Sequence, residues 1–197
     1  TIKKLWNKYN FIGCELRNRT VGIIGYGKIG SRVAKLAQGF EMKTIAYDPY
    51  LDAEEVLKTG TELLTLEEVL KRSDYLTLHV PLTEETKHMI SSKEIAMMKD
   101  GSYIINTCRG GVLDEEATYE FFNIGKIAGV GIDVLEGEIG TEDLSANAIL
   151  DTPLYSINNI VASPHIGGAT IEAYDAIANY IVKKLIDILK LKTNSVV

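Results

Sequence analysis

The sequence predicts an α/β fold in which helices cover a doubly wound, parallel β-sheet. Short runs rich in β-branched residues alternate with stretches of helical periodicity along the chain, and this alternation is typical of a parallel sheet. The 197 residues are 46% apolar, which suffices for one domain with a sizeable core. A glycine-rich turn, residues 25–30, separates the first expected strand from the first expected helix.

Apolar runs and their periodicity locate the elements in order. Strands are expected at 21–24, 44–47, 75–80, 103–106, 130–132 and 160–162. Helices are expected at 28–40, 53–58, 66–71, 92–98, 115–124 and 171–190, and the last of these has an apolar face for packing. Thr65 and Ser91 stand at N-cap positions, each with a glutamate three residues later in capping-box spacing. The acidic stretch 136–158 is expected to be one long loop.

The glycine-rich turn has the G-x-G-x-x-G spacing of a phosphate cradle. Gly25 allows the tight turn, Gly27 would let the backbone approach a pyrophosphate, and Gly30 would let the helix pack closely on the strand. The amides of Lys28 and Ile29 would point at the anion from the N-terminus of the helix. Because a strand precedes this turn and a helix follows it, we expect a Rossmann-type nucleotide-binding domain.

Asp48 ends the next expected strand. A carboxylate at this position can accept hydrogen bonds from the ribose hydroxyls of the adenosine. It would repel the 2′-phosphate of NADP, and neither arginine nor lysine follows closely to bind one. We therefore expect NAD as the cofactor. The alternative for Asp48 is a solvated acid at the end of a strand.

Composition excludes several other classes of protein. The net charge is −6 and the basic residues are scattered, which argues against a nucleic-acid partner. Cys14 and Cys108 lie far apart without metal-ligand spacing, so we expect reduced thiols in a cytoplasmic protein and no metal site. No apolar run reaches the length of about 20 residues that a membrane span needs, and no signal peptide is recognisable. The first residue is Thr1, which suggests a processed or trimmed chain.

Three polar residues follow three of the expected strands. Arg109, Glu138 and His165 come after the fourth, fifth and sixth strands, and ligands of such sheets bind outside the carboxyl ends of the strands. Arginine can bind a carboxylate bidentately, and histidine can exchange a proton with a carbonyl or an alcohol. A neighbouring carboxylate would fix the tautomer of the histidine. With a nicotinamide, this set would interconvert a 2-hydroxy acid and a 2-oxo acid.

Each of the three residues also has a simpler explanation. Arg109 could be a surface ion-pair partner, His165 a capped histidine in a loop, and Glu138 one more acid in an acidic stretch. What favours the catalytic interpretation is that all three are expected at one edge of the sheet, beside a cofactor.

Four motifs, at 25–30, 106–111, 131–138 and 163–170, resemble in their order those of the D-isomer-specific 2-hydroxyacid dehydrogenases. The resemblance runs from about Trp6 to the C-terminus. It implies that Arg109 binds the carboxylate of the substrate. It makes His165 the proton donor and acceptor, with Glu138 as its partner.

The resemblance also implies which residues bind the cofactor. Asp133 would contact the carboxamide of the nicotinamide. The other expected contacts are Val80, Pro81 and Thr86 near the adenosine, Thr107 and Cys108 along the cofactor backbone, and Gly167 and Gly168 in the last motif. Cys108 is expected to be a small filler rather than a nucleophile. His79 is either a pocket residue or a packed histidine, and His88 is expected at the surface.

Members of this family have a second, substrate-binding domain, built mostly from residues that precede the nucleotide-binding domain. We expect this substrate domain to be absent here, so that all 197 residues form one NAD-binding domain. Residues 1–19 would be a connecting helix and an entry segment packed by Trp6, 20–168 the core, and 169–197 the C-terminal helix and tail. Ile139 stands where the family usually has proline. By analogy with the family, the protein would be a homodimer.

The residues 167–170, Gly-Gly-Ala-Thr, favour phosphoglycerate, glycerate and hydroxypyruvate as substrates over lactate. An alternative function is a regulatory protein of the same fold that senses NAD(H), like the corepressors among its relatives. A third is a hydrolase or methyltransferase on this scaffold, which predicts no role for Arg109.

Overall fold

The computed structural model describes residues 12–138 and 151–193, with side chains up to Leu189. Seven parallel strands form one sheet in the order β3-β2-β1-β4-β5-β6-β7. They are β1 (Thr20–Ile24), β2 (Lys43–Tyr47), β3 (Glu62–Leu63), β4 (Tyr75–Leu78), β5 (Ser102–Asn106), β6 (Ile127–Ile132) and β7 (Ile160–Ala162). The predicted α/β fold is confirmed. The expected connecting helix, Trp6 and Ile139 lie outside the described residues.

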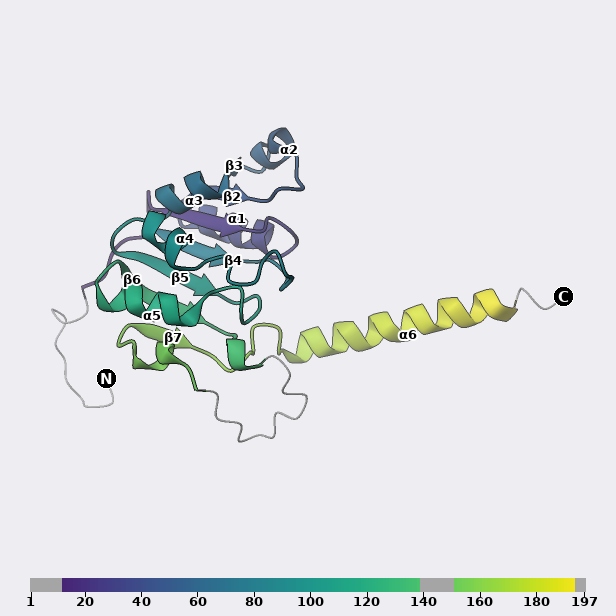
Figure 1. Cartoon of the computed structure of the whole chain (residues 1–197). Helices are drawn as coiled ribbons and strands as arrows, with labels where there is room; N and C mark the ends of the chain where they lie inside the picture. The colour runs from purple at the N-terminus through teal and green to yellow at the C-terminus, as the bar shows by residue number, and fades with distance from the viewer. Residues whose placement is uncertain (1–11, 139–150, 194–197) are drawn as a thin grey trace.

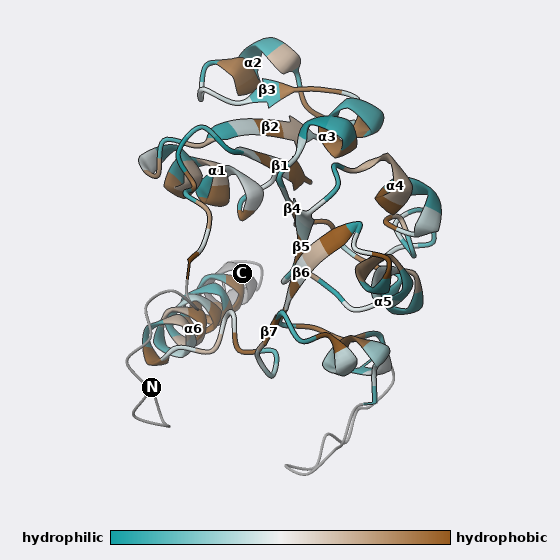
Figure 2. Ribbon diagram, turned by 90° about the vertical axis from the view of Figure 1, so that its left-hand side faces the viewer, coloured by the Kyte–Doolittle hydropathy of each residue, from teal (hydrophilic) through white to brown (hydrophobic). Residues whose placement is uncertain are grey.

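Helices lie on both faces of the sheet, as Figure 2 shows. They are α1 (Gly30–Gly39), α2 (Ala53–Leu57), α3 (Leu66–Arg72), α4 (Ser92–Met97), α5 (Glu115–Asn123) and α6 (Ile171–Thr193). One face carries α3, α4 and α5, whereas α1 packs on the other face against β1 and β2.

The chain runs outward from β1 to β3 and then crosses back to place β4 on the other side of β1. This reversal creates a switch point between β1 and β4. In open α/β sheets the ligand crevice lies at this point, outside the carboxyl ends of the strands. The topology therefore fixes where a cofactor site belongs before any side chain is considered.

One strand was not predicted, and two others differ from their predicted bounds by two residues or more. The two-residue β3 was missed because it has no apolar run of its own. Strand β6 begins at Ile127 rather than at residue 130, because Gly129 and Gly131 interrupt its apolar pattern. A Cβ atom on Gly129 would lie only 2.8 Å from the carbonyl oxygen of Asn159, so glycine is needed there. Strand β4 ends at Leu78, two residues early, and Pro81 beyond it has no amide hydrogen for a ladder.

The prediction of one long loop at 136–158 was wrong in two places. Residues Glu136–Glu138 form the 3₁₀ turn η2, and residues Pro153–Ser156 form the 3₁₀ turn η3. Thr152 caps η3 by accepting a hydrogen bond from the amide of Leu154. Residues 139–150 lie outside the described part of the chain.

Capping explains where two of the short helices begin. At the start of α3 the Thr65 hydroxyl accepts from the amide of Glu68, and the Glu68 carboxylate accepts from the amide of Thr65, as predicted. At α4 the carboxylate of Glu94 accepts from the amide of Ser91 at 3.4 Å. The Ser91 hydroxyl instead donates to Asp114, the N-cap residue of α5, so the two helix starts are joined.

Helix α6 leaves the body of the domain at the carboxyl edge of the sheet (Figure 1). Its apolar face was expected to pack, but its apolar side chains are exposed: Ile177, Ile181 and Leu185 each expose half or more of their surface. None of the described helices combines the length and apolarity that a crossing of a lipid bilayer demands.

Candidate functional site

The turn after β1 forms the expected cradle at the switch point. Gly25 has a φ of +87°, and a Cβ atom there would lie 2.6 Å from the carbonyl oxygen of His79. A Cβ atom on Gly30 would lie 2.1 Å from the carbonyl oxygen of Gly25, whereas one on Gly27 would meet nothing within 4 Å. Two of the three glycines are therefore needed by the fold itself. The third leaves open space on the cofactor side.

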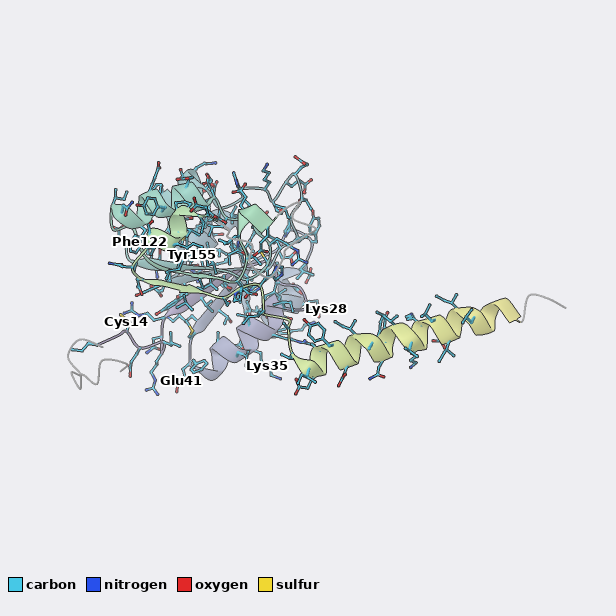
Figure 3. The ribbon with its side chains drawn as sticks, turned by 90° about the horizontal axis from the view of Figure 1, so that it is seen from below. Cys14, Lys28, Lys35, Glu41, Phe122 and Tyr155 are labelled. Carbon is cyan, nitrogen blue, oxygen red and sulfur yellow. The ribbon has the colours of Figure 1, made fainter. Side chains whose placement is uncertain are left out.

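Helix α1 begins at Gly30, two residues later than predicted, so Lys28 and Ile29 belong to the turn. Ser31 fixes this turn, because its amide and its hydroxyl both donate to the carbonyl oxygen of Gly27. In Figure 3 Lys28 lies at the end of the body from which α6 leaves, whereas Cys14 and Glu41 lie toward the opposite end.

A cavity of 340 Å³ opens beside the cradle. Its lining includes Gly25, Gly27, Asp48, Val80, Pro81 and Thr86. The Asp48 carboxylate accepts hydrogen bonds from the amides of Tyr26 and Tyr50 at 3.0 and 3.1 Å. These two bonds hold the carboxylate in a cavity wall and disfavour the explanation of Asp48 as a merely solvated acid.

Thr86 lines this cavity but also shapes it. Its hydroxyl donates to the carbonyl oxygen of Pro81 at 2.6 Å, and it accepts from the amide of Thr83 at 2.8 Å. The segment after β4 is therefore folded into a fixed wall.

A second cavity, of 270 Å³, adjoins the first. It is lined by Ile29, His79, Val80, Pro81, Thr107, Cys108 and Arg109. Because His79, Val80 and Pro81 line both cavities, the two form one trough along the carboxyl edge. The trough leads from Asp48 to Arg109.

Two titratable groups that line the trough, His79 and Cys108, are uncharged at neutral pH. Burial lowers the pKa of His79 to about 4, so its imidazole is neutral, and its Nε2 lies 3.0 Å from the hydroxyl of Thr77. Burial raises the pKa of the Cys108 thiol, which favours the expected filler over a nucleophilic thiolate.

Arg109 stands in a turn that Asn106 holds. The buried Asn106 side chain donates to the carbonyl oxygen of Arg109 at 3.0 Å and accepts from the amide of Cys108 at 3.2 Å. The guanidinium donates to the carbonyl oxygen of Cys108. No carboxylate of the described residues forms an ion pair with it, so the surface ion-pair explanation finds no support. Sequence reasoning missed Asn106, although an asparagine that ends an apolar strand is a usable signal.

Glu138 and His165 are brought together from the turns after β6 and β7. His165 Nδ1 lies 2.8 Å from Glu138 Oε2, and Glu138 Oε1 accepts from the amide of Leu135. The Glu138 side chain is 17% exposed and that of His165 is 52% exposed. An ionised carboxylate can only accept, so Nδ1 carries the hydrogen of this bond.

Asp133 supports the loop that carries His165. It is 4% exposed and accepts from the Ser163 hydroxyl at 2.6 Å and from the amides of Ile166 and Gly167 at 2.9 and 2.8 Å. Burial raises the pKa of Asp133, but these hydrogen bonds and the nearby His165 outweigh burial and hold the pKa below its ordinary value. Sequence reasoning did not find this supporting role or the contribution of Ser163.

A side-chain contact links Glu138 to His165 directly. Arg109 is linked to this pair only through the packing of its backbone turn. A Cβ atom on Gly110 would lie 1.9 Å from the carbonyl oxygen of Leu135, so the turn of Arg109 rests against the turn of Glu138. Within the described ranges no hydrogen bond links the guanidinium to either partner. The three groups thus share one edge of the sheet, in the turns that follow the neighbouring strands β5, β6 and β7.

The fold and the cradle define a dinucleotide-binding domain. The sequence model of the family described as "D-isomer specific 2-hydroxyacid dehydrogenase, NAD binding domain" matches residues 2–167. The chain therefore belongs to this family of NAD-dependent dehydrogenases, through its NAD-binding domain.

Several known proteins are similar to this chain. A hydroxypyruvate reductase of Thermotoga maritima is 44% identical over 180 residues, which are 91% of this chain and 56% of that protein. A D-3-phosphoglycerate dehydrogenase of Methanocaldococcus jannaschii is 39% identical over 94% of this chain and 34% of its own length. The chain thus spans between about a third and a little over half of the curated relatives it matches.

Solved structures share the fold. The D-lactate dehydrogenase of Aquifex aeolicus, complexed with NAD and lactic acid, matches with a TM-score of 0.84 and 35% identity, over 99% of this chain and 61% of that one. The likeness therefore extends over nearly the whole of this chain.

Proposed function

We propose that the protein is an NAD-dependent oxidoreductase that interconverts a D-2-hydroxy acid and the corresponding 2-oxo acid. The observation that carries this proposal is the hydrogen bond between Glu138 and His165 at the carboxyl edge of the sheet. Arg109, without a carboxylate partner among the described residues, lies in the cavity that continues the cofactor trough. An acid–base pair, a free cation for an anion and a dinucleotide cradle together favour this chemistry over other uses of the fold.

The cradle has the features that a dinucleotide requires. The open space at Gly27 would admit a pyrophosphate, with the amides of Lys28 and Ile29 nearby, and the Asp48 carboxylate would bind the ribose. NAD, when bound, accepts or donates the hydride.

Val80, Pro81, Thr107 and Cys108 line the trough, and Thr86 lines its adenosine end. We propose that they contact the cofactor, with Gly167 and Gly168 beside the nicotinamide. A carboxylate offers about four acceptor positions. Asp133 uses three of them within the domain, so it retains capacity for the carboxamide.

The three catalytic groups would divide the work. Arg109 binds the substrate carboxylate through its planar fork and so orients the carbonyl or hydroxyl carbon. His165 Nε2 gives its proton to the carbonyl oxygen during reduction, or takes it from the hydroxyl during oxidation. Glu138 holds Nδ1–H and stabilises the imidazolium that forms.

For the substrate we propose a small, polar acid such as phosphoglycerate, glycerate or hydroxypyruvate. The small residues Gly167, Gly168 and Ala169 after His165 support this choice. Relatives named hydroxypyruvate reductase, D-3-phosphoglycerate dehydrogenase and glyoxylate reductase support the same range.

The test is oxidation of NADH by the full-length protein with hydroxypyruvate, glyoxylate, pyruvate and 2-oxoglutarate. We expect turnover with at least one of them and the highest kcat/KM with hydroxypyruvate or glyoxylate. Tight NADH binding without turnover on any 2-oxo acid would contradict the proposal and favour the sensing function instead. A matched reaction with NADPH checks the selectivity attributed to Asp48.

Three further expectations complete the proposal. Residues 20–168 would be the core of the NAD-binding domain, with 1–19 and 169–197 as its connecting segments. The protein would be a homodimer, by analogy with its family. It would act in the cytoplasm.

A further inference from the structure

A second imidazole–carboxylate pair joins His88 to Glu136, which lies on the same 3₁₀ turn as Glu138. His88 Nε2 lies 3.0 Å from Glu136 Oε1 and 3.1 Å from Glu136 Oε2. Both side chains are a little over a third exposed, so the contact is neither deeply buried nor fully hydrated. His88 was expected to be a surface residue, and nothing in the proposed reaction uses it.

His88 is held firmly on its own side of this contact. Its φ is +48°, a left-handed conformation that few non-glycine residues adopt. Its amide donates to the carbonyl oxygen of Gly111 at 2.7 Å, and Ile90 forms a parallel bridge with Leu113 just beyond. The backbone that follows Arg109 therefore anchors His88, and strain of this kind persists only where the surroundings impose it.

The turn η2 is held from the other side by its first residue. The amide of Glu136 donates to the carboxylate of Glu115 at 2.7 Å, and Gly110 rests against the carbonyl of Leu135. Gly137, which has no side chain, is the one residue between Glu136 and Glu138. Glu138 is itself bonded to the backbone of Leu135 at both its amide and its carboxylate, and the contact of Glu136 with His88 is an additional tether of the same turn.

We propose that His88 and Glu136 are a positioning pair that fixes η2, so that the carboxylate of Glu138 meets Nδ1 of His165. Because an ionised carboxylate only accepts, Nε2 of His88 donates to Glu136 just as Nδ1 of His165 donates to Glu138. Two hydrogen bonds in series then lead from the backbone after Arg109 to the imidazole of the proposed acid. This inference rests on the proposed function for its meaning, but not for its test.

The pair of His88 and Glu136 also connects the turn η2 to the wall of the cofactor cavity. His88 lies between Thr86 and Met89, which both line that cavity. The segment that would contact the adenosine end of the cofactor is therefore tied to the turn that orients the acid–base pair. His88 therefore contributes to the position of both the cavity wall and the turn η2.

The test reads the tautomer of His165 in this chain, which has only three histidines. Long-range ¹H–¹⁵N correlation spectra of the imidazoles distinguish a hydrogen on Nδ1 from one on Nε2. We expect the wild type to show the Nδ1–H form of His165, and Glu138→Ala to lose it. Glu136→Ala and His88→Asn should shift the His165 signals in the direction of the Glu138→Ala spectrum. Asparagine tolerates the left-handed backbone at residue 88 but is too short to reach Glu136.

Two controls separate positioning from general damage. Glu136→Gln keeps an oxygen that accepts from His88, so it should retain the His165 signals of the wild type. Asp100→Asn removes a carboxylate from another ion pair, with Lys126, and should also leave them unchanged. Wild-type His165 signals in both Glu136→Ala and His88→Asn would overturn the proposal, and so would an equal shift of His79. Since no readout depends on turnover, an inactive enzyme with an intact tautomer would contradict only the proposed function.

Discussion

At the scale of single residues, the domain fixes the backbone of Arg109 but provides no carboxylate partner for its guanidinium among the described residues. Asn106 fixes the backbone of its turn, and the guanidinium donates a hydrogen bond to the carbonyl of its neighbour Cys108 but forms no ion pair among the described residues. A cation placed in this way is available for an incoming anion.

We expect Arg109→Ala in the full-length protein to lower kcat/KM for the 2-oxo acid. The loss corresponds to about 3–5 kcal/mol of transition-state stabilisation, because a charge-assisted bidentate contact disappears. Arg109→Lys should recover only part of this loss, since an ammonium lacks the planar fork. Steady-state kinetics measure both, with Arg72→Ala, which breaks an exposed pair with Glu62, as the control. Unchanged kcat/KM in Arg109→Ala would contradict the proposed role of Arg109 in binding the substrate carboxylate.

Asp133 links the stability of the His165 loop to pH. Its folded-state pKa is lowered, so its stabilising contribution is complete above the ordinary value of about 3.9 and disappears as the pH falls through the lower, folded-state value. Asp133→Asn turns one acceptor into a donor and should cost about 1–3 kcal/mol at neutral pH. Urea unfolding at neutral and acid pH measures this, and the difference between wild type and variant should shrink in acid.

Asp74 and Asp114 also have lowered pKa values, so the variant should still lose part of its stability in acid. Asp100→Asn serves as the exposed control. A constant difference between wild type and Asp133→Asn at all pH values would contradict the linkage.

Candidate residues with a reactive or charged side chain were easier to recognise in the sequence than the residues that hold them in place by hydrogen bonds. Arg109, Glu138 and His165 could be proposed as site residues because each follows a strand and has a distinctive functional group. Asn106, Ser163 and Glu115 could not be given roles, because their importance lies in contacts with residues far away in the chain.

At the scale of elements, the three glycines of the cradle should separate stability from binding. In Gly30→Ala the new methyl group meets the carbonyl of Gly25, and overpacking of this kind costs about 1–3 kcal/mol or more. In Gly27→Ala the methyl group enters open space, so stability should change by less than about 0.5 kcal/mol. NADH affinity should nevertheless fall by roughly tenfold, about 1.4 kcal/mol, because the methyl group occupies the approach of the pyrophosphate.

Thermal unfolding and NADH fluorescence titration on this chain measure the two effects. Gly39→Ala, also in open space but at the far end of α1, is the matched control and should change neither. Loss of stability in Gly27→Ala would mean that the turn needs all three glycines for folding.

Element boundaries were predictable where local signals were strong. The starts of α3 and α4 followed from their caps, and the bounds of β1, β2 and β5 followed from their apolar runs to within one residue. Strand β3 and the turns η2 and η3 were missed, because they depend on tertiary contacts such as the hydrogen bond from Glu136 to Glu115. No local sequence pattern contains that information.

At the scale of the whole molecule, α6 stands apart from the domain that carries it (Figure 1). An isolated helix is marginal in water, because most helical stability in proteins comes from packing. We therefore expect the amides of residues 175–189 to exchange hydrogen much faster than those of β1, β4 and β5 in this chain. Hydrogen exchange followed by mass spectrometry measures this. Slow exchange throughout α6 would mean that its apolar face is covered in solution.

The order of strands has a consequence for how the protein matures during synthesis. Pairing of distant strands is slow, because the intervening chain must first be closed into a loop. The carbonyl of His79 packs against Gly25. The nucleotide cradle is therefore complete once β4 has paired with β1. The contact between Glu138 and His165, which we propose for proton transfer, must wait for β7, some eighty residues further along the chain. A polypeptide emerging from the ribosome would thus acquire its affinity for a dinucleotide well before its acid–base chemistry, and the ligand could act as a template for the second half of the sheet.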